Sequence, residues 1–294
     1  VCGFNPLAVF FYYAFLKAGS EVRFLLEKGD SYGKLSEFVF AYRNKKEKLK
    51  LMQVDSGDNF VPHLVLLFSH AYRTSEVCRL IKPFCNENAY IVSFQTGISH
   101  FDIIAGILGE DNLALGISNH VIWPVADDVF RYISGGATFI GRRDRKNTLA
   151  LKKIRQMFPP LVNVKISRNI NSLIWSQLVI RTAIDGWGAV LHFKRGKLIN
   201  NSYSRTLVRM TLAESERIAR RKRIKLSYED AFAKTEGLCE ATPEVGSYFL
   251  WDLEKGRKTE VDYLNGFIYS LGQDLNIPTP LNFILYQAVR ALEK

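Results

Sequence analysis

The sequence lacks the long apolar runs and the repeats that mark several protein classes. In its 294 residues, no apolar run approaches the roughly 20 residues that a membrane-spanning helix needs. The apolar stretch at residues 7–16 has neither a basic segment before it nor a small-residue cleavage site after it, as a signal peptide would. No internal repeat or low-complexity segment occurs. The composition, 47% apolar and 23% charged, is typical of a soluble globular protein. We therefore expect a cytoplasmic protein with no membrane partner.

Cysteine and histidine are also scarce, and neither shows the spacing of a metal or disulfide site. The four cysteines contain no C-x-x-C pair, so we expect buried free thiols in a reducing compartment. The five histidines have no ligand spacing either, which argues against a bound metal ion.

A net charge of +11 is spread along the whole chain. Residues 1–160 contain 20 Lys and Arg against 15 Asp and Glu, and residues 161–294 contain 20 against 14. Such a field favours anionic ligands in general. The densest basic run, residues 217–225, ends a predicted helix, where cations suit the helix dipole. Because no reading module and no stacking aromatics accompany this run, nucleic-acid binding is the least favoured function.

Strand-like and helix-like segments alternate through the first half of the chain. A strand stub at residues 1–2 leads through a glycine turn into an apolar helix, and the chain is expected to begin inside that strand. This alternation predicts a Rossmann-like α/β domain with a doubly wound sheet over residues 1–167. The expected strands are 22–26, 63–68, 90–94, 113–117 and 129–133, with an edge hairpin of 38–42 and 48–54, and the expected helices are 6–17, 76–84 and 146–157.

The periodicity changes to helical after Pro159-Pro160. A last strand is expected at residues 162–166, and no later stretch has a strand pattern. We therefore expect an all-α domain over residues 168–294. Its predicted helices are 170–183, 203–223, 228–236, 259–275 and 280–292.

The first turn departs from the phosphate-binding pattern G-x-G-x-x-G/A. It reads GFNPLA, with Gly3 and Ala8 in place but Asn5 at the second glycine. That glycine lets backbone approach a pyrophosphate, and the helix start supplies free N–H donors. Asn is also a good N-cap and Pro6 suits the next position, so the helix can cap itself without phosphate. A weakened cofactor site and a self-capped helix both remain open.

The end of the second strand bears on the choice of cofactor. An acid there holds the ribose 2′-hydroxyl of NAD, and an Arg suits the 2′-phosphate of NADP. Glu27 would repel that phosphate, whereas Lys28 could attract it. The pair favours NADH over NADPH if a dinucleotide binds. The alternative is that Glu27 is a surface residue without a role.

Four stretches carry motifs in a fixed order along nearly the whole chain. They are the opening VCGFNPLAVFFYYAFLKAG, then FSHAYRT with FQTGI, then LIWSQLVIRTAID, and last SYFLWDLEKGRKTEVDYLNG followed by IPTP. Together they resemble the ketopantoate reductase (2-dehydropantoate 2-reductase) family, and the last stretch is the most specific. The resemblance implies a Rossmann domain, a helical domain like the C-terminal domain of 6-phosphogluconate dehydrogenases, and a cleft between them. It also implies NADPH-dependent reduction of a 2-oxo acid, a step of pantothenate biosynthesis.

The departures from the family lie where the family performs its chemistry. Its cofactor-binding Lys falls on His70, and its Q-N-G motif reads Gln95-Thr96-Gly97. Its catalytic Lys, two residues after the Trp, falls on Gln177. Of its main catalytic set only the acid Glu260 is retained. Its two helical Asn residues fall on Arg181 and Asp185, and its Ser falls on Tyr248.

Gln177, Arg181 and Asp185 are spaced i, i+4, i+8 and share one helix face. Reduction of a ketone needs a proton on oxygen, which a Lys with a tuned pKa can supply and Gln177 cannot. Arg181 can polarise a carbonyl or bind a carboxylate, but it is a poor proton donor near neutral pH. A structural ion pair of Arg181 with Asp185 or Glu260 is favoured over a catalytic role.

Three further residues have both a functional and a structural interpretation. Glu260 meets the substrate by resemblance, or it is a carboxylate in the first turn of a helix, favoured by the dipole. Tyr248 is bulky where the family has a small hydroxyl, so it is expected to fill part of the substrate pocket. His70 could donate to a ribose or phosphate, although a lone His after a buried strand is more often structural.

The sequence thus predicts an NAD(P)H-dependent reductase of 2-dehydropantoate or a related 2-oxo acid. The alternative is a protein of the same fold that no longer catalyses and serves as a binding or oligomeric partner, since the family's Lys and its second glycine are both absent. A homodimer is expected. The candidate residues are Glu260, Gln177 and Arg181 for catalysis, Thr96, Asp185 and Tyr248 for substrate, and Gly3, Asn5, Ala8, Glu27, Lys28, His70 and Thr96 for NADPH or NADH.

Overall fold

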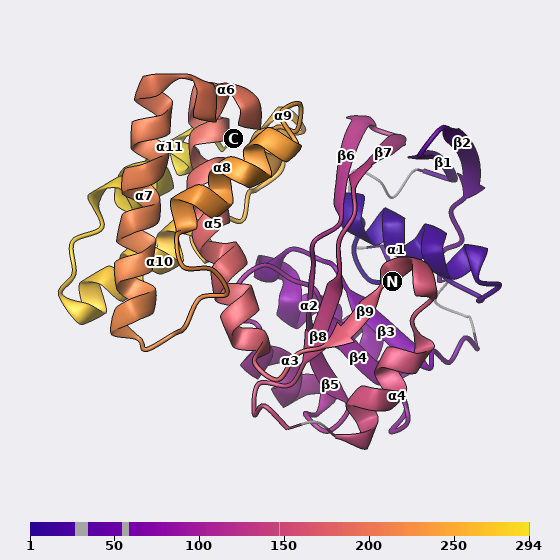
Figure 1. The fold of residues 1–294 in the computed structure, drawn as a ribbon. Helices are drawn as coiled ribbons and strands as arrows, with labels where there is room; N and C mark the ends of the chain where they lie inside the picture. Colours follow the sequence, from indigo (N-terminus) through magenta and orange to yellow (C-terminus); the bar gives the residue numbers. More distant parts are fainter. Residues whose placement is uncertain (27–34, 55–58, 147, 294) are drawn as a thin grey trace. The chain divides into compact units, whose positions relative to one another are not determined.

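The computed structural model of the chain describes residues 1–26, 35–54, 59–146 and 148–293. They divide into one unit of Val1–Gln95 with Ser99–Ile170 and a second of Thr96–Ile98 with Asn171–Lys294. All described strands lie in the first unit, and the second is helical (Figure 1). The predicted α/β domain and all-α domain are thereby confirmed. Glu27 and Lys28 lie outside the described residues.

A five-stranded sheet carries the parallel core of the first unit. In the order β3-β4-β5-β8-β9, the first three strands run parallel, β8 is antiparallel to β5, and β9 is parallel to β8. Every residue of β5 is buried, as in strands that are covered on both faces. The strands are β3 (Leu64–Leu67), β4 (Tyr90–Ser93), β5 (Leu113–Ser118), β8 (Thr138–Gly141) and β9 (Val164–Ile166), and the helices between them are α2 (Thr74–Ile81), α3 (Phe101–Leu108) and α4 (Leu149–Met157).

A second sheet of four strands replaces the predicted edge hairpin. It contains β1 (Glu37–Tyr42), β2 (Lys45–Lys50), β6 (Val121–Ala126) and β7 (Val129–Ser134) in the order β2-β1-β7-β6. The prediction of one doubly wound sheet is wrong on this point. The hairpin also turns earlier than predicted, because Arg43 adopts a left-handed φ of 54°. The strand β6 escapes prediction because it contains Pro124, which is tolerated on an edge strand.

Helix α1 (Pro6–Lys17) lies between the two sheets (Figure 1). Its sequence has no polar face, and residues 8–15 are all buried. The ring of Phe11 lies 5.0 Å from that of Phe68, just beyond β3, whereas the ring of Tyr13 lies 4.6 Å from that of Phe40 in β1. A helix that is apolar all round has to be covered on all sides. The second sheet provides that cover.

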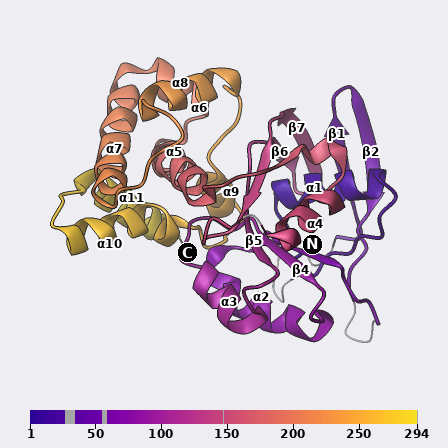
Figure 2. The ribbon, with the colours of Figure 1, turned by 60° about the horizontal axis from the view of Figure 1, so that its bottom comes forward.

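The second unit is built around helix α5 (Ile170–Leu191), as Figure 2 shows. This helix contributes Val179 and Ala183 to one apolar cluster and Trp175 and Leu178 to another. Among the residues described, no helix combines the length and the apolar character that a membrane crossing would require. The other helices are α6 (Arg195–Asn200), α7 (Ser202–Arg221), α8 (Ala231–Ala241), α9 (Tyr248–Glu254), α10 (Asn265–Leu275) and α11 (Pro280–Leu292).

Several helix boundaries differ from the prediction, each with a local cause. The helix predicted at 228–236 begins at Ala231, behind Asp230, whose carboxylate caps the Ala233 amide. The helix predicted at 259–275 begins at Asn265, after a short 3-10 turn over Val261–Tyr263. Glu260 therefore precedes that turn and is not in the first turn of a helix, contrary to the structural interpretation of its role.

Candidate functional site

The turn before α1 requires glycine at its first position. Gly3 has a φ of +84°, and a Cβ atom there would come within 2.5 Å of the Ser69 backbone. The Gly3 amide donates to the Leu25 carbonyl, which fixes the turn beside Leu25. The strand predicted at residues 22–26 is reduced to isolated β-bridges at Phe24 and Leu25. The next side chain, Phe4, is buried and packs against Phe24 with ring centroids 5.2 Å apart. The turn thus passes close to the Ser69 backbone, and only glycine fits at its first position.

Asn5 caps helix α1 as its sequence position indicates. Its Oδ1 accepts from the Ala8 amide at 2.8 Å, and its Nδ2 donates to the Phe68 carbonyl at 2.8 Å. One of the donors that a phosphate would use is therefore occupied, and Pro6 has none to offer. Within the described part of the chain, the amides of Asn5 and Leu7 have no acceptor. These two amides leave the turn able to bind an anionic group, with fewer donors than a glycine-rich turn has.

The loops that follow β3 and β4 are joined by Gln95. Its amide nitrogen donates to the Ser69 carbonyl and hydroxyl, at 3.1 and 3.0 Å, and to the Thr74 hydroxyl at 3.0 Å. His70 lies in this region and stacks on Tyr72 with ring centroids 5.1 Å apart. Both loops lie at the carboxyl ends of parallel strands, where doubly wound folds bind their ligands.

In the second unit, four of the predicted site residues form one polar chain. Arg181 Nε donates to Asp185 Oδ2 at 2.7 Å, and Arg181 Nη1 donates to Thr96 Oγ1 at 2.7 Å. Thr96 Oγ1 in turn donates to Glu260 Oε2 at 2.5 Å. Asp185 and Glu260 are both buried. The predicted ion pair of Arg181 with Asp185 is present, and the same guanidinium also reaches a hydroxyl held by a second carboxylate.

Tyr248 and Gln177 lie around this chain. The Arg181 guanidinium lies over the ring of Tyr248, 5.9 Å from its centroid. Gln177 is half-buried, one helical turn before Arg181 on α5. The structure thus brings Thr96, Arg181, Asp185, Glu260 and Tyr248 together, with Gln177 on the same helix face.

Burial and charge set the protonation states in this cluster. Burial lowers the pKa of Arg181, but the charges of Asp185 and Glu260 outweigh it, so the pKa lies above its ordinary value. Burial raises the pKa of Tyr248, against the opposing charges of Arg195 and Arg181. Arg181 is therefore a permanent cation, and Tyr248 is a neutral phenol at physiological pH.

Two residues of this region are absent from the predicted set. Arg195 is buried, and its Nη1 donates to Thr242 Oγ1 at 2.9 Å. Ser247 caps α9, and its hydroxyl donates to the Asp185 carbonyl at 2.7 Å. The signal for Arg195 is its spacing, because it shares the i, i+3, i+4 face of α6 with the buried Leu198 and Ile199. Its neighbours Lys194 and Lys197 hide that signal, since the three together suggest a solvated basic segment.

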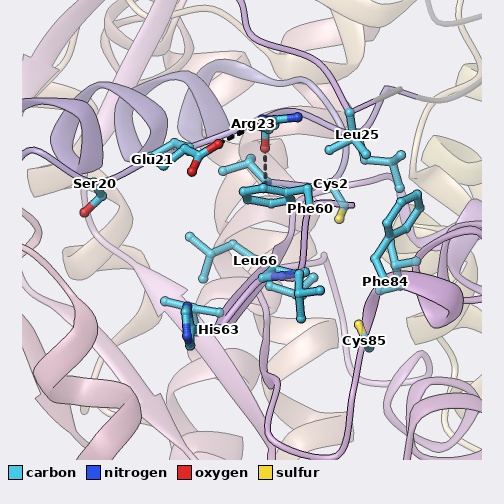
Figure 3. Close-up of a pocket in the computed structure, with 18 of the residues that line it drawn as sticks. Cys2, Ser20, Glu21, Arg23, Leu25, Phe60, His63, Leu66, Phe84 and Cys85 are labelled. Atoms are coloured by element: carbon cyan, nitrogen blue, oxygen red, sulfur yellow. Dashed lines mark hydrogen bonds and ion pairs between the residues drawn. The ribbon is translucent and has the colours of Figure 1, made fainter. Parts of the chain in front are cut away.

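A pocket of about 1000 Å³ lies in the first unit (Figure 3). It is lined by the start of β3, by Val1 and Cys2, and by Phe84 and Cys85 beyond α2. None of the predicted site residues lines it. It opens at the amino ends of the strands, opposite to the edge where such folds bind ligands. Burial raises the pKa of the Cys85 thiol to about 11, so this sulfur is unreactive near neutral pH.

Comparison with known proteins identifies the family of the chain. The fold defines a Rossmann-type domain followed by a helical domain, the architecture of a class of dehydrogenases. Two family models match, "Ketopantoate reductase PanE/ApbA" over residues 1–145 and "Ketopantoate reductase PanE/ApbA C terminal" over residues 169–293. The chain belongs to the ketopantoate reductase family.

The relatives are distant in sequence but cover most of the chain. The 2-dehydropantoate 2-reductase of Pyrococcus abyssi is 26% identical over 235 residues, which are 79% of this chain and 76% of that protein. A ternary structure of D-mandelate dehydrogenase with NADH and anilino(oxo)acetate has a TM-score of 0.86 at 21% identity, covering 99% and 97% of the two chains. A PanE/ApbA family ketopantoate reductase from Ralstonia eutropha JMP134 has a TM-score of 0.82 at 22% identity, covering 99% and 96%.

Proposed function

We propose that this protein is an NAD(P)H-dependent reductase of 2-dehydropantoate or a related 2-oxo acid. The observation that carries the proposal is the partly buried chain of hydrogen bonds from Arg181 through Thr96 to Glu260. Reduction of a ketone places negative charge on its oxygen and then a proton on the same atom. A fixed guanidinium meets the first need, and a hydroxyl backed by a carboxylic acid meets the second. The family of the chain supports the same reaction.

The turn before α1 fits the pyrophosphate of a nicotinamide dinucleotide. The free amides of Asn5 and Leu7 would bind phosphate oxygens, and Gly3 permits the close backbone path. When bound, the cofactor supplies the hydride. The similar D-mandelate dehydrogenase is in complex with NADH, and Glu27 favours the same cofactor here. We therefore propose NADH over NADPH, with affinity reduced by the Asn5 cap.

Arg181 stabilises the alkoxide that forms as the carbonyl oxygen gains charge. It keeps its own proton, because Asp185 and Glu260 raise its pKa. Gln177, at the position of the family's Lys, has no proton to give. In the resting protein Thr96 donates to the Glu260 carboxylate at 2.5 Å. We assign the proton to the state in which Glu260 has taken a proton from solvent: Glu260 then donates its proton to Thr96, while the hydroxyl hydrogen of Thr96 passes to the alkoxide. Solvent then reprotonates Glu260 before the next turnover.

Binding and turnover test this proposal in sequence. Calorimetric titration of the full chain with NADH and with NADPH measures cofactor binding, and loss of the reduced-nicotinamide absorbance with 2-dehydropantoate measures turnover. We expect binding and slow turnover. Absence of binding at millimolar cofactor would overturn the proposal. It would instead favour the catalytically inactive binding or oligomeric partner, the function that the Asn5 cap and Gln177 support.

A further inference from the structure

Arg195 is a buried cation without a carboxylate partner. Only 6% of its surface is exposed, and Nη1 donates to Thr242 Oγ1 at 2.9 Å. Its Nε is buried and has no hydrogen-bond partner. Within the described residues, no ion pair joins Arg195 to any Asp or Glu. A buried guanidinium in this state is unfavourable, since its charge has left water without full compensation.

The helix dipole accounts for only part of this arrangement. Thr242, which receives the Nη1 bond, ends helix α8, and a cation near a helix C-terminus is favoured by the dipole. The dipole accounts for the position of Nη1, but it does not account for a buried Nε that has no acceptor. A purely structural cation would also be expected to pair, as Arg181 does with Asp185 at 2.7 Å on the neighbouring helix.

Backbone contacts place Arg195 beside the proposed reaction site. Its amide donates to the Val245 carbonyl at 3.0 Å, so it packs against the segment that leads into Ser247 and Tyr248. The Ser247 hydroxyl ties that segment to α5 at the Asp185 carbonyl. The Arg181 guanidinium lies over the ring of Tyr248, which follows Ser247 directly, 5.9 Å from the ring centroid.

The two arginines differ in what they can still bind. The charge of Arg181 is already balanced by Asp185 and Glu260, and its nitrogens bond Asp185 and Thr96. Arg195 has an unused Nε and an unbalanced charge. The guanidinium fork matches a carboxylate in two parallel hydrogen bonds. A ligand carboxylate would supply both the acceptor and the charge that Arg195 lacks.

We propose that Arg195 binds the carboxylate of the substrate and makes the protein selective for carboxylate-bearing carbonyl compounds over neutral ones. This assignment rests on the proposed function. It orients the substrate so that the carboxylate lies toward Arg195 and the 2-oxo group toward Arg181 and Thr96. Tyr248, whose ring lies against the Arg181 guanidinium, would then contact the same substrate.

Calorimetry with a charged and an uncharged probe tests the assignment without any turnover. The probes are 2-oxoisovalerate and its methyl ester, titrated into the full chain with and without NADH. We expect the anion to bind about 10- to 100-fold more tightly than the ester, the range for a hydrogen-bonded charge. In Arg195→Met this preference should disappear, and in Arg195→Lys part of it should remain. Arg209→Met, which removes an exposed arginine, should keep the preference.

A second measurement covers the case in which Arg195→Met does not fold. In wild-type protein labelled with ¹⁵N-arginine, the Nε–H resonance assigned with Arg195→Lys should shift on adding 2-oxoisovalerate and stay in place with the ester. Equal binding of acid and ester, or an unchanged preference in Arg195→Met, overturns the assignment. Selective anion binding without turnover would overturn the reductase proposal alone, and turnover without this selectivity would overturn the role of Arg195 alone.

Discussion

Glu260 and Thr96 act as a pair, because the hydroxyl has an acid behind it only while Glu260 is present. In the resting protein Thr96 accepts from Arg181 and donates to Glu260 Oε2, and protonation of Glu260 frees the Thr96 hydrogen to turn toward the substrate. The proposed proton path therefore depends on the identity of the Glu260 side chain more than on its volume.

Replacement of Glu260 by Gln should separate binding from proton transfer. The Gln oxygen can still accept from Thr96, but the side chain cannot release a proton, so kcat should fall about 100-fold or more. KM should change little. Steady-state kinetics measure both constants, with Asp262→Asn as a matched control, since Asp262 pairs with Lys258 outside the polar chain. Equal losses in the two variants would contradict a proton role for Glu260.

Asn5 sets the affinity for cofactor in the proposed function. In Asn5→Gly the Ala8 amide is released and space opens before α1, so NADH affinity should rise about tenfold, the gain expected for one charged hydrogen bond. The free energy of unfolding should fall by about 1 kcal/mol, because the cap and the bond to Phe68 are lost. Calorimetry and urea unfolding measure the two effects. Asn5→Asp keeps the cap and adds a negative charge, so it should bind NADH more weakly than wild type.

Among the elements, α1 depends most clearly on tertiary contacts. Phe11 is fully buried and contacts Phe68 and Phe94, with ring centroids 5.0 and 4.9 Å away. Phe11→Ala should lower the free energy of unfolding by about 3–5 kcal/mol. Tyr203→Ala, which removes an aromatic ring that is 82% exposed, should change it by less than about 0.5 kcal/mol. If urea unfolding shows only a small change in the free energy of unfolding for Phe11→Ala, Phe11 is not part of a closely packed core around α1.

His120 links β7 to the segment before β9, and this link should depend on pH. Its Nδ1 contacts the Tyr132 hydroxyl at 2.9 Å and its Nε2 the Val162 carbonyl at 3.1 Å. Burial lowers the pKa of His120, against the bond to Val162, which raises it. His120 therefore binds a proton more readily in the unfolded chain than in the folded protein. This part of the stability is complete above about pH 6.5, the unfolded pKa, and is lost as the pH falls through the lower folded pKa.

Unfolding midpoints at pH 7.5 and pH 5.5 measure this dependence. The loss of stability on acidification should be smaller in His120→Gln than in wild type. His63→Gln serves as the control, because His63 is exposed and should leave the loss unchanged. An identical loss in wild type and His120→Gln would show that His120 is not responsible.

Element types were predictable where the local pattern is strong, and boundaries were not. The run at β3 and the cap at Asn5-Pro6 contain their own signals, and both appear as expected. The second sheet has no local sequence signal, because it is stabilised by packing against α1 and its strand β6 contains Pro124. The 3-10 turn at Val261–Tyr263 likewise depends on packing rather than on local propensity.

At the scale of the whole molecule, the sequence predicts the residues of the polar chain but does not predict the buried cation Arg195. Arg181, Asp185 and Glu260 lie in the recognisable motifs, although about 75 residues separate Asp185 from Glu260. Thr96 lies 85 residues before Arg181 in the sequence, so no local pattern predicts the hydrogen bond between them. Arg195 lies outside every motif, and its burial follows only from the packing of α6 against the segment after α8.

The homodimer expected from the sequence remains a prediction for the whole molecule. Sedimentation equilibrium of the full chain should give twice the chain mass of 33.6 kDa. The measured mass should not change on adding NADH, because the turn before α1 is closed by contacts within one chain. A mass of one chain at micromolar concentration would refute the homodimer.

The position of α1 between two sheets has a consequence for biosynthesis. Residues 6–17 leave the ribosome more than 100 residues ahead of β6 and β7, which complete their cover. Throughout that interval an apolar twelve-residue segment with no polar face is exposed to other chains. We therefore expect residues 6–17 to be prone to aggregation in the nascent chain until residue 134 has been synthesised.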